Sequence, residues 1–360
     1  MPIWMCVTTR TSAAELAIDL GAIVANWRTL GTIHTAGAVA AVVKADAYGL
    51  GADRVGPALA DAGCRHFFVA HLAEAVALRH VVPEAMIAVL NGLWPGDADS
   101  YHEHRLLPVL GSLAEIDAWR GPALLHLDTG MNRLGLDAAA IDALHADPAR
   151  LRSIELRYLM THLISAEAID DAVNERQRGR FGALCARFAR TIPRSLANSS
   201  GIFLGPRFAS DLARPGAALY GINPTPGRPN PMRPAVHLRT RILQTRCVRP
   251  GESVGYNGHW TAGRDSRVGV CSVGYADGWL RALTNRGEAG FDGERIPLVG
   301  RVSMDLTTFD LTGTRAREGD WLDLIGPEVP VDRVAQLAGT NAYEILTSLG
   351  ARYARTYRGA

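Results

Sequence analysis

Short apolar runs alternate with amphipathic stretches from about residue 12 to residue 238. The runs are typical of buried strands, and the stretches between them have the apolar spacing of helices. This order predicts repeated strand–helix units around a parallel sheet. The expected strands are 38–43, 66–70, 86–90, 107–109, 123–127, 154–160, 195–197 and 208–212. Because a closed parallel barrel has eight strands, we expect an α/β fold, a (β/α)8 TIM-like barrel.

The pattern changes after Pro224, where prolines crowd residues 224–234. Such a segment indicates a linker or a surface excursion. Short β-like runs follow it, and helical spacing returns at 331–338 and 343–349. We therefore expect two domains, a barrel at 12–238 and a mainly β domain at 239–360. Residues 1–11 would be free to pack with the second domain.

Composition and charge narrow the function classes. The chain is 48% hydrophobic and 21% charged, with a net charge of +2 and no concentrated basic run. Nucleic acid and membrane surfaces are therefore not favoured as partners. The N-terminal residues lack the pattern of a signal peptide, and no apolar run approaches a bilayer-spanning length. Five scattered cysteines without CxxC spacing predict reduced thiols and no metal site, so we expect a cytoplasmic enzyme.

A lysine stands at the end of the first expected strand. Lys44 follows the apolar run 39–43 and precedes Gly49 and Gly51, which would break the strand into a helix. The C-terminal ends of barrel strands are where such barrels place their chemistry. A lysine desolvated there can act as a Schiff-base nucleophile or as a base. Taken alone, a lysine that extends from a strand end into solvent is the more common explanation.

Polar or small residues follow several later strands. They are Arg133, His162, Ser199, Arg214, Gly216 and Ala217. Barrels usually bind phosphate at the ends of the seventh and eighth strands, where the last four of these residues lie. Each is an ordinary loop residue by itself. An amine, a phosphate cradle and an arginine at one barrel mouth together point to pyridoxal phosphate, which needs all three.

Seven short motifs resemble the alanine racemase family. They stand in the family's order and cover most of the chain: VKADAYGLG at 43–51, DTGMNRLG at 128–135, RPG at 214–216, Gly221 after Tyr220, VGY at 254–256, GYADG at 274–278 and GRVSMD at 300–305. The first is very similar to the family's specific cofactor-lysine signature. The resemblance implies a pyridoxal-phosphate-dependent racemase that interconverts L-alanine and D-alanine.

The resemblance also implies two acid/base residues. Lys44 would hold the cofactor covalently and, once the substrate displaces it, act on one face of the substrate α-carbon, with Tyr256 on the opposite face. Two bases on opposite faces suit a reaction that removes a proton from one side and returns one to the other. Arg214 would face the pyridine nitrogen, and His162 would belong to a hydrogen-bond chain joining Arg214 to Tyr256. Because a guanidinium does not readily give up its proton, Arg214 would weaken the electron sink and restrain side reactions.

The other matched residues would hold the cofactor and the substrate. The implied phosphate ligands are Tyr48, Ser199, Gly216 and Ala217. Arg133 and the backbone of Met304 would contact the substrate carboxylate, while Tyr275 would restrict the size of the side chain. In the family, the β domain of one subunit completes the barrel mouth of the other. A homodimer with shared sites is therefore expected, although closure within one chain stays open at this point.

The sequence departs from the family at three positions. Many members have a lysine two residues before the Asp-Thr-Gly motif, where this chain has His126. Arg133 would then be oriented by His126 or by a bound anion. The phosphate-contacting tyrosine that many members carry near the C-terminus corresponds to Ala351, and a frequent histidine near the seventh strand corresponds to Ser195.

Three alternatives remain at the level of sequence. A basic amino-acid decarboxylase of the same barrel type would normally have a glutamate where Arg214 stands and a catalytic cysteine in the β domain. A non-catalytic pyridoxal-phosphate-binding protein would lack the β domain and Tyr256. A serine or broad-specificity racemase would share every motif, and the motifs fit both cell-wall precursor supply and D-alanine catabolism.

Overall fold

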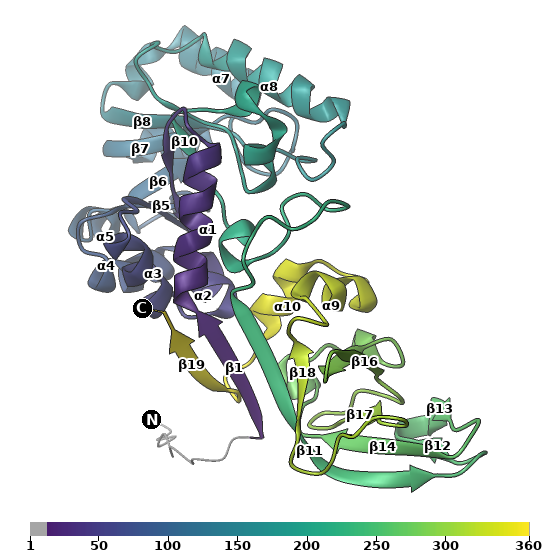
Figure 1. The fold of residues 1–360 in the computed structure, drawn as a ribbon. Coiled ribbons are helices and arrows are strands. Elements are labelled where there is room, and N and C mark those ends of the chain that lie inside the picture. Colours follow the sequence, from purple (N-terminus) through teal and green to yellow (C-terminus); the bar gives the residue numbers. More distant parts are fainter. Residues whose placement is uncertain (1–12, 360) are drawn as a thin grey trace. The chain divides into compact units, whose positions relative to one another are not determined.

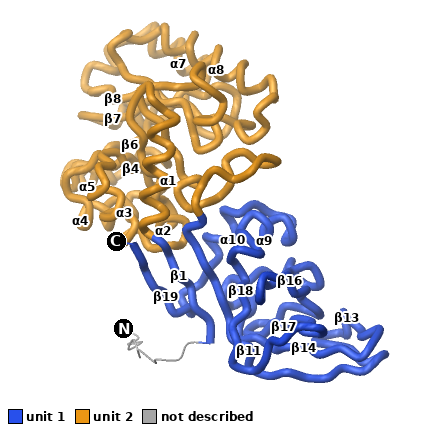
Figure 2. Tube along the Cα trace, viewed as in Figure 1, with its two compact units in different colours: residues 1–19, 234–359 blue, residues 20–233, 360 orange. Residues whose placement is uncertain are grey.

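The chain forms two compact units, which are described separately. The computed structural model describes residues 13–359, so the expectation for residues 1–11 lies outside the described residues. Residues 20–233 form a barrel unit, and residues 13–19 with 234–359 form a β unit (Figure 2). This division differs from the expected 12–238 and 239–360 at both ends of the barrel. The reason is β1 (Ala14–Asp19), which pairs with β11 (Val236–Val248) and β19 (Ala354–Arg358).

The barrel unit contains the expected eight-membered ring of parallel strands. Its strands are β2 (Ala38–Val39), β3 (Ala41–Val42), β4 (His66–Val69), β5 (Met86–Val89), β6 (Leu107–Leu110), β7 (Gly121–His126), β8 (Ile154–Met160), β9 (Arg194–Ser195) and β10 (Leu212–Ala213). Strands β3 to β9 form one parallel sheet, and β10 pairs with β2. Backbone bonds from Arg214 to Ala197 (2.8 Å) and from Val42 to Pro215 (2.9 Å) close the ring. The predicted barrel is thus confirmed, with β2 and β3 forming one interrupted first strand. The last strand begins only at Leu212, because the 3-10 turn η3 (Pro206–Phe208) takes up the start of 208–212 and residues 209–211 form no strand.

Helices of the barrel unit connect these strands (Figure 1). They are α1 (Leu20–Ile33), α2 (Lys44–Gly49), α3 (Ala52–Asp61), α4 (Leu72–Val81), α5 (Ala98–Glu103), α6 (Leu113–Ala118), α7 (Ala138–Ala146) and α8 (Ala172–Cys185). Side chains of Ser112, Asp137 and Asp171 accept backbone N–H groups at the starts of α6, α7 and α8. Such caps fix where a helix begins and therefore where the preceding strand-end loop stops. None of the helices among residues 13–359 is long and apolar enough to cross a membrane.

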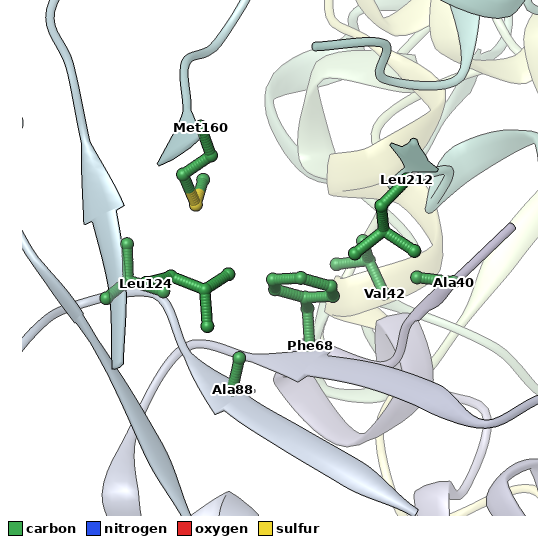
Figure 3. Packing of buried hydrophobic residues seen from close by; sticks show 8 residues of the cluster. Ala40, Val42, Phe68, Ala88, Leu124, Met160 and Leu212 are labelled. Carbon is green, nitrogen blue, oxygen red and sulfur yellow. The ribbon is translucent and has the colours of Figure 1, made fainter. Parts of the chain in front are cut away.

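Apolar side chains from the strands fill the barrel interior (Figure 3). Phe68 is the largest of them and is fully buried, with smaller apolar residues around it. The cluster comprises Ala40, Val42, Phe68, Ala88, Val109, Leu124, Met160 and Leu212. Because this interior is packed, polar chemistry is confined to the ends of the strands.

The β unit is organised around the long strand β11. Its first half pairs with β1 and with β18 (Trp321–Ile325), and its second half pairs with β14 (Ser266–Cys271) after an irregularity between Ile242 and Gln244. The remaining elements are β12 (Ser253–Val254), β13 (Trp260–Thr261), β15 (Glu288–Phe291), β16 (Glu294–Pro297), β17 (Thr307–Asp310), α9 (Val331–Ala338) and α10 (Ala342–Ser348). A mainly β domain was expected here, and the structure confirms it.

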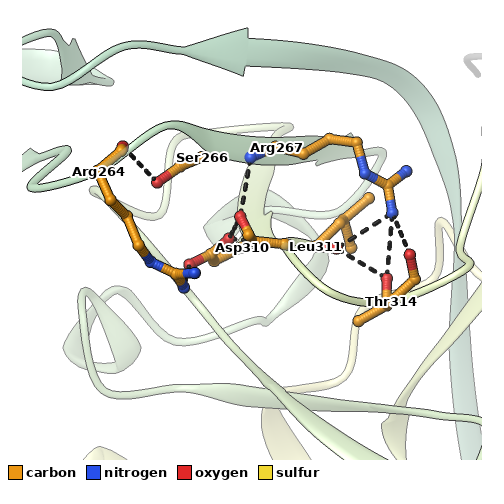
Figure 4. Close-up of polar contacts among 7 residues, drawn as sticks. Arg264, Ser266, Arg267, Asp310, Leu311 and Thr314 are labelled. Atoms are coloured by element: carbon orange, nitrogen blue, oxygen red, sulfur yellow. Dashed lines mark hydrogen bonds and ion pairs between the residues drawn. The ribbon is translucent and has the colours of Figure 1, made fainter.

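Polar contacts fasten the loop after β17 to β14 (Figure 4). The Arg267 guanidinium donates to the backbone oxygens of Leu311 (3.1 Å) and Thr314 (2.7 Å). Arg264 forms an ion pair with Asp310 at 3.3 Å. These bonds satisfy loop carbonyls and hold the sheet edge in place.

Candidate active site

Lys44 stands where β3 ends and an unusual turn begins. Residues 45–48, none of them glycine, have φ values between 52° and 57°, so α2 is a left-handed turn. Such a conformation costs about 1–2 kcal/mol per residue. It persists only where the surrounding structure fixes it. Part of that support comes from Ala52, whose N–H donates to Asp46 Oδ1 at 2.7 Å.

The amine of Lys44 is held in a partly buried, mixed electrostatic environment. Burial lowers its pKa from the ordinary value, and the positive charge of Arg133 lowers it further. The carboxylate of Glu74 acts in the opposite direction. A lowered pKa increases the fraction of uncharged amine, which is the form that attacks a carbonyl or accepts a proton.

Tyr48 lies against the segment that follows β10. A Cβ atom at Gly216 would lie 2.3 Å from Tyr48 Oη, so the close approach requires glycine. The ring of Tyr48 lies 4.7 Å from that of Tyr220, centroid to centroid, and Tyr220 Oη donates to the backbone of Val42 at 3.0 Å. Burial raises the pKa of Tyr48 to about 12, so its hydroxyl stays a hydrogen-bond donor at neutral pH.

Hydroxyl and backbone groups gather at the ends of the last two barrel strands. Ser199 is buried, and its Oγ accepts from the backbone N–H groups of Gly216 (3.1 Å) and Ala218 (3.2 Å). Ala217 lies between these donors, at the start of the 3-10 turn η4 (Ala217–Tyr220). Tyr48 Oη lies beside Gly216 as well, so hydroxyl and backbone N–H groups of the kind that bind phosphate gather at this end of the barrel.

Arg214 is a buried cation between two strand ends. Its guanidinium donates to Ser195 Oγ and to the backbone oxygen of Thr161, each at 2.5 Å. Across residues 13–359, no carboxylate pairs with it. Burial lowers its pKa to about 10, which still leaves it charged at neutral pH. A fixed charge of this kind suits an electron-rich ring atom.

Two histidines near Arg214 are neutral at pH 7. Burial, and then the charges of Arg214 and Arg133, lower the pKa of His162 to about 3. Burial and Arg214 likewise lower the pKa of His126 to about 4. In the described part of the chain, no hydrogen bond joins the His162 ring to Arg214, so the expected chain from Arg214 to Tyr256 stays a prediction.

Arg133 projects from a loop that Asp128 organises. Asp128 Oδ1 accepts from the backbone of Gly130 and of Met131, each at 2.9 Å. The Arg133 side chain is exposed and, within residues 13–359, makes no hydrogen bond or ion pair. His126 therefore does not orient it through a hydrogen bond. The guanidinium remains available for a carboxylate.

Tyr256 lies in the β unit, in the connection between β12 and β13. It begins the 3-10 turn η5 (Tyr256–Gly258), and 69% of the residue is exposed. The backbone oxygen of His259 accepts from Asn285 Nδ2 at 2.7 Å, and the His259 ring contacts Arg301. These contacts tie the Tyr256 loop to the segment that leads to Met304.

Tyr275 and Met304 are held together by backbone contacts. The N–H groups of Tyr275 and Ala276 donate to Ser303 and Met304, each at 3.0 Å. A Cβ atom at Gly274 would lie 2.3 Å from the Met304 oxygen, so this packing also requires glycine. Tyr275 is 44% exposed and Met304 54% exposed. The β unit thus gathers its three predicted site residues on one connected set of loops and leaves them uncovered.

Comparison with known protein families agrees with this geometry. The model of the alanine racemase N-terminal domain matches residues 18–224, and the model of the alanine racemase C-terminal domain matches residues 235–357. The chain belongs to the alanine racemase family. Relatives support the assignment along nearly the whole length. The alanine racemase of Acidiphilium cryptum (strain JF-5) is 55% identical over 352 residues, which are 95% of this chain and 98% of that one. That of Methylobacterium sp. (strain 4-46) is 50% identical over 361 residues, covering 97% of this chain and 99% of the relative.

Solved alanine racemase structures share the fold. A crystal structure of alanine racemase from Bartonella henselae with covalently bound pyridoxal phosphate is 40% identical to this chain. Its TM-score is 0.93, and the match covers 97% of this chain and 100% of that one. The biosynthetic alanine racemase from Pseudomonas aeruginosa is 34% identical, with a TM-score of 0.91 over 97% of this chain and 100% of that one.

Within this alanine racemase fold, some supporting residues were not assigned roles from the sequence. Ser195 was noted as a departure from the family, but its role as an acceptor for Arg214 needed the structure. Tyr220 was noted only as the residue before Gly221, and its tilted contact with the Tyr48 ring needed the structure. Glu74 lies three residues after His71, which is the spacing of a helix capping box, and the structure shows that box.

Proposed function

We propose that this member of the alanine racemase family is a pyridoxal-phosphate-dependent enzyme that interconverts L-alanine and D-alanine. The observation that carries the proposal is the position of Lys44 at a strand end of the barrel. The ends of the last two strands of the same barrel carry the hydroxyl and backbone groups of Ser199 and Gly216. Alanine racemases at 50–55% identity over nearly the whole chain support the same activity.

The residues present fit the cofactor. Lys44 is the only lysine in the 360-residue sequence, so one side-chain amine can hold it. Tyr48, Ser199, Gly216 and Ala217 would hold the phosphate, and Arg214 would face the pyridine nitrogen. When bound, the cofactor withdraws electrons from the substrate α-carbon and so makes its proton removable. The covalently bound pyridoxal phosphate of the Bartonella henselae relative supports this assignment.

Proton transfer would use one residue from each unit. Lys44 has a lowered pKa, which suits it to take or return a proton near neutral pH. Tyr256 would serve the opposite face of the α-carbon. Arg133 and the Met304 backbone would hold the substrate carboxylate, His162 would join the hydrogen bonds between Arg214 and Tyr256, and Tyr275 would limit side-chain size.

The exposed residues of the β unit support a homodimer with shared sites. Tyr256, Tyr275, Met304 and Leu306 are all more than 40% exposed in the single chain. Exposed apolar residues beside functional groups are typical of surfaces that a partner covers. We therefore assign Tyr256 to the barrel site of a second copy. We also place the protein in the cytoplasm, supported by the free thiols of Cys64, Cys185, Cys247 and Cys271.

A single preparation tests the chemistry. The purified protein is expected to absorb visible light, and borohydride reduction should fix the cofactor on the one peptide that contains Lys44. The protein should convert L-alanine to D-alanine faster than it converts L-serine, L-lysine or L-arginine. Lys44→Ala should lower racemisation by at least about 10⁴-fold, since it removes both an acid/base group and the attachment point. Full racemisation by Lys44→Ala would refute the assignment, and preference for serine would favour the broader specificity.

A further inference from the structure

One carboxylate bridges the ends of two neighbouring barrel strands beside Lys44. Glu74 lies in the first turn of α4, which follows β4. Its Oε1 accepts from the N–H of Ala45 at 2.7 Å, directly after Lys44. Its Oε2 accepts from the N–H groups of Ala70 (2.8 Å) and His71 (3.1 Å), where β4 passes into α4.

We propose that Glu74 is a positioning residue for Lys44, and that its carboxylate holds the left-handed turn that aims Lys44 and Tyr48 at the cofactor site. This inference rests on the proposed function, which gives Lys44 and Tyr48 their roles. Glu74 itself is not required to touch cofactor or substrate.

The geometry explains why a carboxylate is needed at this point. Ala45 is the first of four consecutive non-glycine residues in the left-handed conformation, and Tyr48 is the last. The Ala45 N–H therefore lies at the hinge between an ordinary strand and a strained turn. A carboxylate has acceptor oxygens on two sides, so it can bind Ala45 and the α4 terminus at once. Without the bond to Ala45, the turn loses a restraint at its start, and the side chains at both of its ends can shift.

Glu74 also contributes charge to the surroundings of Lys44. The other charged or titratable groups acting on this amine are Arg133 and His162. Arg133 disfavours the ammonium form, whereas Glu74 favours it and keeps the pKa of Lys44 from falling further. Removing the charge should therefore lower the pKa of Lys44. Shortening the side chain keeps the carboxylate, which should still favour the ammonium form of Lys44.

The chain offers a matched control in Glu115. Its Oε2 accepts from the N–H of Gly111 at 2.8 Å, and its Oε1 accepts from the N–H of Leu93 at 2.9 Å. It occupies the third position of α6, as Glu74 does in α4, and it likewise joins the segments after two neighbouring strands. No left-handed run of non-glycine residues lies beside it among residues 13–359. Loss of Glu115 thus reproduces the loss of a bridging cap without touching the Lys44 turn.

The test compares Glu74→Gln, Glu74→Asp and Glu115→Gln as full-length protein. Glutamine keeps the length but loses the charge and one acceptor, while aspartate keeps the charge but is too short to bridge both segments. One measurement is kcat/KM for alanine with the cofactor-loaded enzyme. The other is made on cofactor-free protein after reductive methylation with ¹³C-formaldehyde. Because the chain has one lysine, its ¹³C signal separates from that of the α-amino group, and its pH titration reports Lys44 alone.

The two Glu74 variants should lower kcat/KM by about 100-fold, the scale expected when a reacting group is misplaced by about 1 Å. In Glu74→Gln, the Lys44 signal should also titrate at lower pH than in the parent, and Glu74→Asp should show the smaller change. Glu115→Gln should match the parent in the titration. The proposal is overturned if both Glu74 variants stay within about twofold of Glu115→Gln in kcat/KM, well inside the expected misplacement effect. If the parent does not racemise alanine, the titration still reports the Glu74 contact, so the two failures are distinguishable.

Discussion

Apart from the exposed Arg133, the two units present their predicted site residues in opposite ways. In the barrel unit, Arg214 and Ser199 are only 4% and 7% exposed, and hydrogen bonds from neighbouring strand ends hold them. In the β unit, Tyr256 and Tyr275 are 69% and 44% exposed, and backbone contacts between loops position them. The barrel residues are part of the packing that makes the fold, whereas the β residues are carried on its surface. Substitutions of the buried barrel residues should therefore alter stability and activity together, and those of the exposed β-unit residues should alter activity alone.

The largest combined effect is expected from Arg214→Met. The change leaves the buried Thr161 oxygen without its donor, at about 1–3 kcal/mol for a buried group left unpaired, while Ser195 Oγ keeps its bond to the Leu212 oxygen. Alanine racemisation should fall by about 100-fold or more, because a fixed charge is lost from the cofactor site. Urea unfolding and kcat/KM measured on the same preparation check both parts. If this variant has the same free energy of unfolding as the parent, the buried barrel residues do not couple stability to activity.

Tyr256→Phe should give the next largest effect, on activity alone. The loss of one of two acid/base groups should slow racemisation by about 10²–10⁴-fold. The free energy of unfolding should change by less than about 0.5 kcal/mol, since the side chain is exposed. In deuterated solvent, exchange of the α-proton should be impaired mainly from one enantiomer. Equal impairment from both enantiomers would contradict a two-base arrangement.

Acid should lower the free energy of unfolding through two histidines of the barrel unit. His162 and His126 have pKa values of about 3 and 4 in the folded chain, against an ordinary value of 6.5. The unfolded chain therefore binds more protons between pH 6.5 and about 4, so the free energy of unfolding should fall as the pH is lowered through this range. His162→Gln should flatten that dependence in urea titrations at pH 7 and pH 5. His145→Gln, which alters an exposed histidine of α7, should leave the slope as it is.

Sequence patterns predicted which residues lie at strand ends better than they predicted the contacts that support those residues. The strand-end positions of Lys44 and Arg214 could be predicted, because buried strands have a clear apolar pattern and barrels place their chemistry at one end of it. The residues of β1 were assigned to the barrel, since a short alternating run does not reveal which sheet it joins. The left-handed turn could not be predicted, because no glycine marks residues 45–48 and local propensity opposes that conformation. Glu74 also binds Ala45, which follows a neighbouring strand. The capping-box spacing predicts only the contacts that Glu74 makes at the start of its own helix.

The smallest effect is expected from a substitution of Tyr275, which tests whether an exposed β-unit residue selects the substrate without contributing to stability. Tyr275→Ala should change the free energy of unfolding by less than about 0.5 kcal/mol, because the backbone bond to Ser303 remains and the side chain is exposed. The ratio of serine to alanine kcat/KM should rise by about 10-fold, since removing a side chain that limits size relaxes selection by a small steric margin. Leu243→Ala is the matched control, because it truncates a similarly exposed apolar residue on β11, 48% exposed, away from the site loops. An unchanged ratio in Tyr275→Ala would show that side-chain size is selected by the barrel unit, which would confine the surface role of the β unit to Tyr256 and Met304.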